Sequence, residues 1–182
     1  MNVRVLSLVI LFVPFVNASL AQDAKPPMIY PIIANYGGVV ARPTAQQPPR
    51  AGAKVVFDVT ADAKPADVNK GLDRVARLLN LYGAAELRSV DIQIVVVFHG
   101  EATKTVLSDA AYQRRFGLEQ NPNLPLLRTL QQHGVQVLVC GQALNYKEIA
   151  DQELADAIPI AAAAMTTVIN KQMDGYAYLP IP

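Results

Sequence analysis

The sequence IQIVVVFHG, at residues 92–100, decides the fold class of this chain. Every position from Ile92 to Phe98 is apolar except Gln93, and Gly100 ends the run. A strand that is buried on both faces has such a continuous β-branched composition, and these strands are typical of parallel sheets covered by helices. The run therefore predicts a central strand of an α/β domain.

The segments on either side of this run alternate between strand and helix patterns. Further strands are expected at residues 55–59, 135–139, 157–160 and 176–181. Helices are expected between them at residues 65–82, 103–116, 126–133, 147–150 and 161–173. The first is indicated by apolar residues that recur at steps of three and four positions. Repeated β–α units predict a parallel sheet with helices on both faces and right-handed crossovers.

The N-terminal segment has the three parts of a secretory signal peptide. Arg4 gives a charged start, residues 5–16 form an apolar run, and the small residues Ser19 and Ala21 precede a predicted cut after Ala21. The run of about a dozen residues is shorter than the roughly 20 that span a bilayer. We therefore expect a cleaved signal peptide at residues 1–21, no membrane span, and a periplasmic or secreted mature protein.

Residues 22–53 form a proline-rich arm or linker ahead of the domain at residues 54–182. Its prolines remove backbone donors and fix φ, so neither a regular helix nor a central strand is expected there. Its middle, from Met28 to Val40, is apolar enough to require a covering surface. Two interpretations stay open: a strap over its own domain, or an arm docked on a neighbouring subunit.

Charge and motif content exclude several classes of function. The chain has 16 Lys and Arg against 15 Asp and Glu, which argues against a nucleic-acid binder and a polybasic membrane-surface protein. The single cysteine, Cys140, excludes an internal disulfide and a cysteine-built zinc site. No GxGxxG or GxSxG motif is present, so neither a dinucleotide cofactor nor serine hydrolase chemistry is supported. We expect no cofactor and no metal, and whether the chain is an enzyme stays open.

The candidate site lies where the expected strands end, because ligands of such folds bind at the carboxyl ends of strands. The residues at the ends of three expected strands are Asp58, Thr60, His99, Gly100, Cys140, Gly141 and Gln142. A strand-end cysteine thiolate can accept a sulfane sulfur as a persulfide, and His99 can act as a base or orient that thiolate. The other five residues are expected to line a cleft.

A structural interpretation of both reactive residues stays open beside this one. Free cysteines often serve as small buried apolar side chains, and Cys140 ends an apolar strand. His99 can equally be a buried imidazole bonded to a backbone carbonyl. Just beyond it, Glu101 is expected to pair with Lys104 across one helical turn.

Four stretches carry a resemblance to a known family: KVVFDVT at 54–60, IVVVFHGEATKTVL at 94–107, NPNLPLLRTLQQHGVQVLVCGQAL at 121–144 and MDGYAYLPIP at 173–182. In this order they resemble the DsrE/DsrF-like family, in its exported, stand-alone branch. The resemblance implies a three-layer α/β/α domain with a mostly parallel five-stranded sheet, assembled as homo-oligomers, often trimers or hexamers. In the sulfur-relay members, a cysteine after the third strand carries persulfide sulfur between partner proteins, and Cys140 matches that position.

Two hypotheses for the function follow. The first is an exported sulfur carrier or sulfurtransferase-like protein that accepts sulfane sulfur on Cys140, with His99 as the neighbour that tunes it and a sulfur donor or acceptor protein as partner. The second is a non-catalytic oligomeric module that binds a small ligand or a partner, in which Cys140 is structural.

Overall fold

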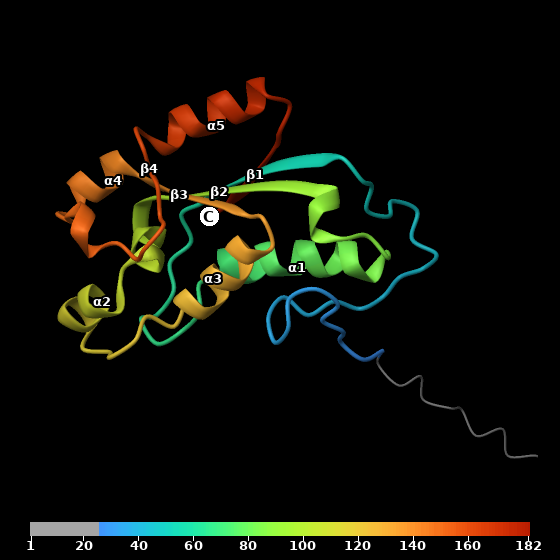
Figure 1. Cartoon of the computed structure of the whole chain (residues 1–182), viewed down its shortest axis with the longest axis horizontal. Helices are drawn as coiled ribbons and strands as arrows, with labels where there is room; N and C mark the ends of the chain where they lie inside the picture. Colours follow the sequence, from blue (N-terminus) through green and yellow to red (C-terminus); the bar gives the residue numbers. More distant parts are fainter. Residues whose placement is uncertain (1–25) are drawn as a thin grey trace, which may run out of the picture.

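The computed structural model describes residues 26–182, and the predicted signal peptide lies outside the described residues. Five parallel strands form one sheet in the order β4-β3-β2-β1-β5 (Figure 1). Their bounds are Ala53–Val59 for β1, Ile92–Phe98 for β2, Gln136–Cys140 for β3, Ile160–Ala161 for β4 and Ala177–Ile181 for β5. The expected five-stranded parallel sheet is thus confirmed, with the run at residues 92–98 at its centre.

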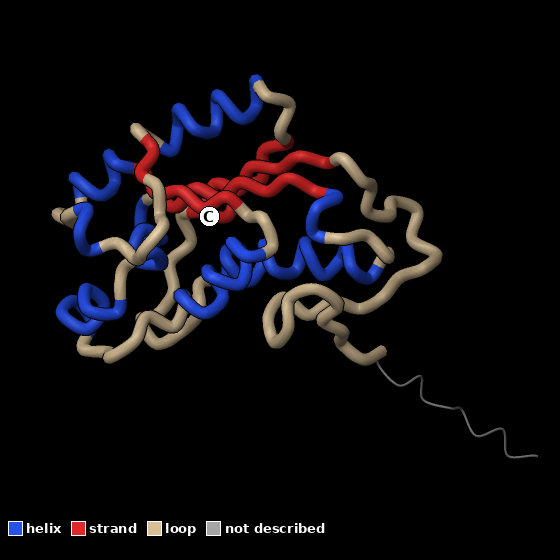
Figure 2. Tube along the Cα trace, viewed as in Figure 1, coloured by secondary structure: helices blue, strands red, loops and turns tan. Residues whose placement is uncertain are grey.

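Helices cover both faces of the sheet, which gives the expected three layers. Figure 2 shows the sheet between two groups of helices, with α1 and α3 on one side and α5 on the other, as labelled in Figure 1. The α-helices are α1 (Lys70–Ala84), α2 (Asp109–Phe116), α3 (Leu124–Gln132), α4 (Gly141–Tyr146) and α5 (Ala164–Met173), with 3-10 turns η1 (Ser89–Asp91), η2 (Gly100–Val106) and η3 (Asp151–Glu153). Within residues 26–182, no helix is long and apolar enough to cross a membrane.

The two faces of the sheet are covered very unequally. The main core lies on the α1 and α3 side, where Val59, Val96 and Leu72 are completely buried. A much smaller cluster lies on the α5 side and contains only Val97, Cys140 and Ala164 as buried members. Most of the burial that stabilises the domain therefore comes from one face, and Cys140 lies in the thin layer on the other.

Three expected helices differ from the observed ones, two of them because capping side chains set their limits. The first begins at Lys70 and not at residue 65, since the Asn69 side chain accepts a hydrogen bond of 2.8 Å from the backbone N–H of Gly71. The helix expected at 103–116 splits into η2 and α2, because Ser108 caps α2. The helix expected at residues 147–150 is wrong: α4 starts directly after Cys140, and Lys147 already follows its end.

The described part of the proline-rich arm lies across α1 of its own domain. Ile33 is completely buried there, and Ile29 pairs with Val39 in an isolated antiparallel bridge. Asn80 of α1 holds this loop, because its Oδ1 accepts hydrogen bonds from the backbone of Ile32 and Ile33. Its Nδ2 donates to the carbonyl oxygens of Ile33, Tyr36 and Gly37. The structure thus shows the arm as a strap over α1.

Replacing Asn80 by alanine removes every one of these contacts and leaves buried backbone groups without partners. We expect Asn80→Ala to lower the free energy of unfolding by about 3 kcal/mol, because each buried unsatisfied polar group costs about 1–3 kcal/mol. Urea denaturation measures the change. Asn170→Ala, at an exposed position of α5, is the matched control and is expected to stay within about 0.5 kcal/mol of the parent. Equal effects of the two substitutions would contradict the role given to Asn80.

Candidate functional site

Three of the predicted site residues lie on the α5 face of the sheet, at the carboxyl ends of neighbouring strands. Val97 belongs to the cluster on that face, and Asp58 is its partner in the β1–β2 register. His99 comes two positions after Val97, with extended backbone angles, so its side chain leaves the same face. Cys140 is a member of the same cluster, on β3.

A fourth residue, Tyr178 of β5, completes this arrangement. Tyr178 is the register partner of Val56, which lies two positions before Asp58 and so shares its face. In the sheet order β3-β2-β1-β5, four neighbouring strands therefore present a thiol, an imidazole, a carboxylate and a phenol in sequence. We call Cys140, His99, Asp58 and Tyr178 the strand-end row, after its first three members; Tyr178 is the second residue of β5.

His99, which follows β2, Asp58 of β1 and Tyr178 of β5 are joined by hydrogen bonds. His99 Nε2 lies 2.6 Å from Asp58 Oδ1, and the Tyr178 hydroxyl donates to Asp58 Oδ2 at 2.9 Å. The contact with His99 lowers the pKa of Asp58, burial opposes this, and the bond from Tyr178 adds to the lowering. The same bond raises the pKa of Tyr178, because the carboxylate binds the neutral phenol. Asp58 is therefore the anionic centre of the row.

Cys140 lies at the other end of the row and is 5 % exposed. The β2–β3 register pairs Phe98 with Val139, so the next residues along the two strands, His99 and Cys140, lie on adjacent strands. Cys140 is also the residue before the first turn of α4, and Ala164 packs over it from α5. Cys140 thus lies on the strand next to β2, which His99 follows, and its thiol is covered by α5.

The remaining predicted residues hold the backbone around the row. The Thr60 backbone N–H donates to the Ile181 carbonyl at 3.0 Å, and Gly100 turns the chain with φ of 55°. Gly141 packs closely on β4, since a Cβ there would lie 3.0 Å from the Ala161 carbonyl oxygen. Gln142 donates its side-chain amide to the Ala162 carbonyl at 3.1 Å. These contacts fix the strand ends to β5, β4 and the start of α5.

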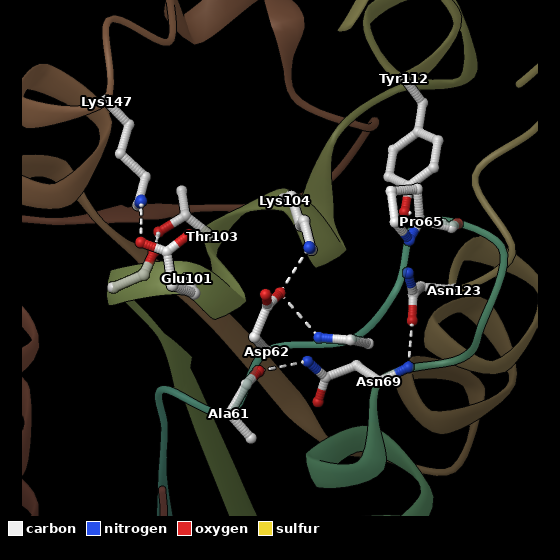
Figure 3. Close-up of polar contacts among 12 residues, drawn as sticks. Ala61, Asp62, Pro65, Asn69, Glu101, Thr103, Lys104, Tyr112, Asn123 and Lys147 are labelled. Carbon is white, nitrogen blue, oxygen red and sulfur yellow. Dashed lines mark hydrogen bonds and ion pairs between the residues drawn. The ribbon is translucent and has the colours of Figure 1, made fainter. Parts of the chain in front are cut away.

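Polar contacts also join the segments that follow β1, β2 and α4 (Figure 3). Lys104 of η2 pairs with Asp62, and the Lys147 ammonium donates to Glu101 Oε1 at 2.6 Å. The expected pair of Glu101 with Lys104 is therefore wrong. The two residues lie on one 3-10 turn, but each finds a partner from a different segment.

No group of three or more histidine, cysteine or acidic residues within residues 26–182 is arranged to hold a metal ion. The row offers acid–base and nucleophilic groups instead: one thiol, one imidazole and one carboxylate restrained by a phenol. Such a set can move a proton and activate a sulfur nucleophile.

Tyr178 was missed by the sequence reasoning, although a signal for it exists. The last strand is aromatic and short, and the alternation of side chains places Tyr178 and Pro180 on the face opposite to Leu179. Placing Tyr178 beside Asp58 requires the β5 strand to pair with β1, and strand order does not follow from the hydrophobic pattern.

Comparison with known proteins identifies the family. The model of the DsrE/DsrF-like family matches residues 54–181. The chain belongs to the DsrE/DsrF-like family. Among solved structures, it is similar to a protein of unknown function from Methanobacterium thermoautotrophicum, with a TM-score of 0.54 and 18 % sequence identity over 70 % of this chain and 98 % of that chain. A search of the curated proteins gave no match. For this DsrE/DsrF-like protein, the structural similarity supports the fold.

The lowered pKa of Asp58 predicts a specific pH dependence of stability. A carboxyl group whose native pKa is depressed stabilises the fold above its unfolded pKa, and this contribution is lost as the pH falls through the native value. We expect the stability difference between the parent and Asp58→Asn to be largest near neutral pH and to shrink between about pH 5 and pH 2. Thermal unfolding of both proteins across this range measures it. The exposed control Asp67→Asn should follow the parent; a gap at Asp58 that does not change with pH would contradict the account.

Proposed function

We propose that this protein is an exported sulfur carrier, periplasmic or secreted, that accepts sulfane sulfur on Cys140 with His99 as the neighbouring base. The observation that carries the proposal is the strand-end row, in which Cys140 and His99 follow the paired residues Val139 and Phe98 of adjacent strands, and the histidine is bonded to a carboxylate. Membership of the DsrE/DsrF-like family supports the sulfur chemistry, and the apolar N-terminal run supports export.

The transfer step needs no redox partner. Cys140 loses its thiol proton to His99, and the thiolate attacks the terminal sulfur of a donor persulfide R–S–SH. A new S–S bond forms at Cys140, the S–S bond of the donor breaks, and the thiolate R–S⁻ leaves and takes up the proton held by the imidazole. The sulfur carried on Cys140 can pass to an acceptor thiol by the same displacement in reverse.

Burial of Cys140 requires the α5 layer to move before sulfur enters. α5 is suited to this, because Ala164 is the only residue of the helix that is buried, and the chain before it is a run of alanines. Few apolar contacts hold such an element, so local opening costs less free energy than opening of the main core.

The burial of Cys140 also favours a second candidate function, a non-catalytic oligomeric module that binds a small ligand or a partner. In that case Val97 and Ala164 simply pack around an inert side chain. The two functions differ in one property: a carrier thiol reacts in the folded protein, and a packing thiol reacts only after unfolding.

The proposal predicts a mass gain on Cys140. Mature protein treated with glutathione persulfide should gain one or more sulfur atoms in intact mass spectrometry, and dithiothreitol should remove them. Cys140→Ser should gain none, and His99→Gln should gain sulfur more slowly near neutral pH by about 100-fold, the lower end of the usual effect of losing a general base. An unmodified parent protein whose thiol reacts only in denaturant would move the assignment to the binding module.

The outer face of α5 supports a homo-oligomer as part of the proposal. Met165, Ile169 and Met173 recur every four residues and are 74 %, 49 % and 82 % exposed. They form one apolar stripe along the helix, and exposed apolar stripes of this kind commonly mark protein interfaces. We propose that a second copy of the chain covers this stripe in a homo-oligomer.

Charged substitutions in the stripe should dissociate this assembly. Ile169→Glu and Met173→Glu are expected to shift the mass in light scattering to that of a single chain, because a buried unpaired carboxylate is costly. Asn170→Glu, an exposed neighbour on the same helix, is the control and should keep the parent mass. A parent protein that is already monomeric, or one whose mass the stripe variants leave unchanged, would refute the interface.

A further inference from the structure

The carboxylate of Asp58 is shared between two neighbouring strands. Its Oδ1 contacts His99 on the β2 side, and its Oδ2 accepts from Tyr178 on the β5 side. The side chain of Asp58 is only 18 % exposed, while that of His99 is 29 % exposed. A carboxylate that is held by two donors and shielded from water is restrained in both position and charge.

These contacts determine which nitrogen of the His99 ring carries the proton. The lowered pKa keeps Asp58 ionised over the neutral range, and an ionised carboxylate can only accept hydrogen bonds. His99 Nε2 must therefore donate, and the neutral imidazole keeps its lone pair on Nδ1. Within the described residues, Nδ1 takes part in no hydrogen bond, so this lone pair is free to act as a base.

We infer that Asp58 and Tyr178 are positioning residues, which hold His99 as the Nε2–H tautomer so that Nδ1 takes the thiol proton of Cys140. The inference rests on the proposed function, because it assigns the proton path of the same sulfur transfer. The proton leaves Sγ for Nδ1, the thiolate attacks the donor sulfur, and the imidazolium returns the proton to the leaving thiolate. Cys140 and His99 are neighbours across two strands without a hydrogen bond between them here, and such contacts tighten when substrate is bound.

The charged and titratable groups near His99 lie on several elements around it. Asp58 lies on β1, Tyr178 on β5 and Cys140 on β3, while Glu101 follows on η2 and is already paired with Lys147. On the α5 side, the apolar residues that pack on this face are Ala164 and Val168, with Ala163 before them, and the charged residue of the helix, Lys171, lies over the ring of Tyr176. Asp58 is therefore the group that decides the proton position on His99.

A merely structural role for Asp58 would use the same contacts to tie β1, β2 and β5 together. Asparagine at this position separates the two roles. It has nearly the shape of aspartate and still bonds to His99, but its amide can donate as well as accept and so admits either tautomer. Asp58→Asn thus keeps the hydrogen bonds between the strands but no longer fixes which ring nitrogen of His99 carries the proton.

The test measures the alkylation rate of Cys140 by iodoacetamide between pH 6 and 9 in the mature protein and its variants. A neighbouring base has its largest effect at the lower end of this range, because the supply of thiolate limits the rate there. Asp58→Asn and His99→Gln are expected to lower the rate there by about 100-fold, the lower end of the usual contribution of a general base, and to converge with the parent at the upper end. Tyr178→Phe removes one hydrogen bond and should lower it by about 2- to 10-fold.

Asp62→Asn is the matched control, since it removes a carboxylate of the same edge that pairs with Lys104 outside the row. It should leave the profile unchanged. Profiles of Asp58→Asn and His99→Gln that coincide with the parent overturn the inference; if Cys140 still gains sulfur from glutathione persulfide, the carrier function stands. A thiol that reacts with neither reagent in the folded protein overturns both. If Asp58→Asn does not fold, Tyr178→Phe and His99→Gln decide the question.

Discussion

The hydrogen bond between His99 and Asp58 is the interaction on which the candidate site depends. It exists only because β1 and β2 run parallel in a register that puts Asp58 opposite Val97. His99 comes two residues after Val97 and therefore lies on the same face of the sheet, where it contacts Asp58. A shift by one residue would send one of the two side chains to the other face of the sheet. The main core behind the sheet, on the α1 and α3 side, fixes this register. Packing on one face thus sets up the chemistry on the other.

The unequal layers of the domain give the proposed carrier function a route to its buried thiol. The α1 side carries nearly all of the large buried side chains, together with the strap held by Asn80. The α5 side contributes little burial and presents an apolar stripe outward. The α1 face therefore supplies most of the stability, and the α5 face is the side from which Cys140 is reached. On this account α5 can move away from the sheet, or be covered by another copy of the chain, while the sheet stays intact. The polar contacts of Asp62 and Glu101 hold the strand ends during such a movement.

The sequence predicts the sheet well because continuous β-branched runs have few other structures open to them. The strand at residues 92–98 is predicted with its observed bounds, and the common edge of Asp58, His99 and Cys140 follows from the parallel topology. The helix limits are less predictable, since they depend on caps such as Asn69 and Ser108, which resemble ordinary loop residues. The alternation of the last strand predicts which side chains share a face with Tyr178, but the place of Tyr178 beside Asp58 depends on which strand β5 joins, and the sequence does not predict that. The partner of Glu101 likewise comes from a distant segment.

The most direct test of the row is a nitrogen-15 NMR measurement of the His99 ring, in the parent protein and in Cys140→Ala. The account predicts that His99 at neutral pH carries its proton on Nε2, that Nδ1 is unprotonated in the neutral ring, and that the Nδ1 resonance changes when Cys140 is replaced. His133, which lies outside the row after α3, gives the internal reference. A neutral ring protonated on Nδ1, or a His99 spectrum that does not respond to the loss of the thiol, would contradict the account.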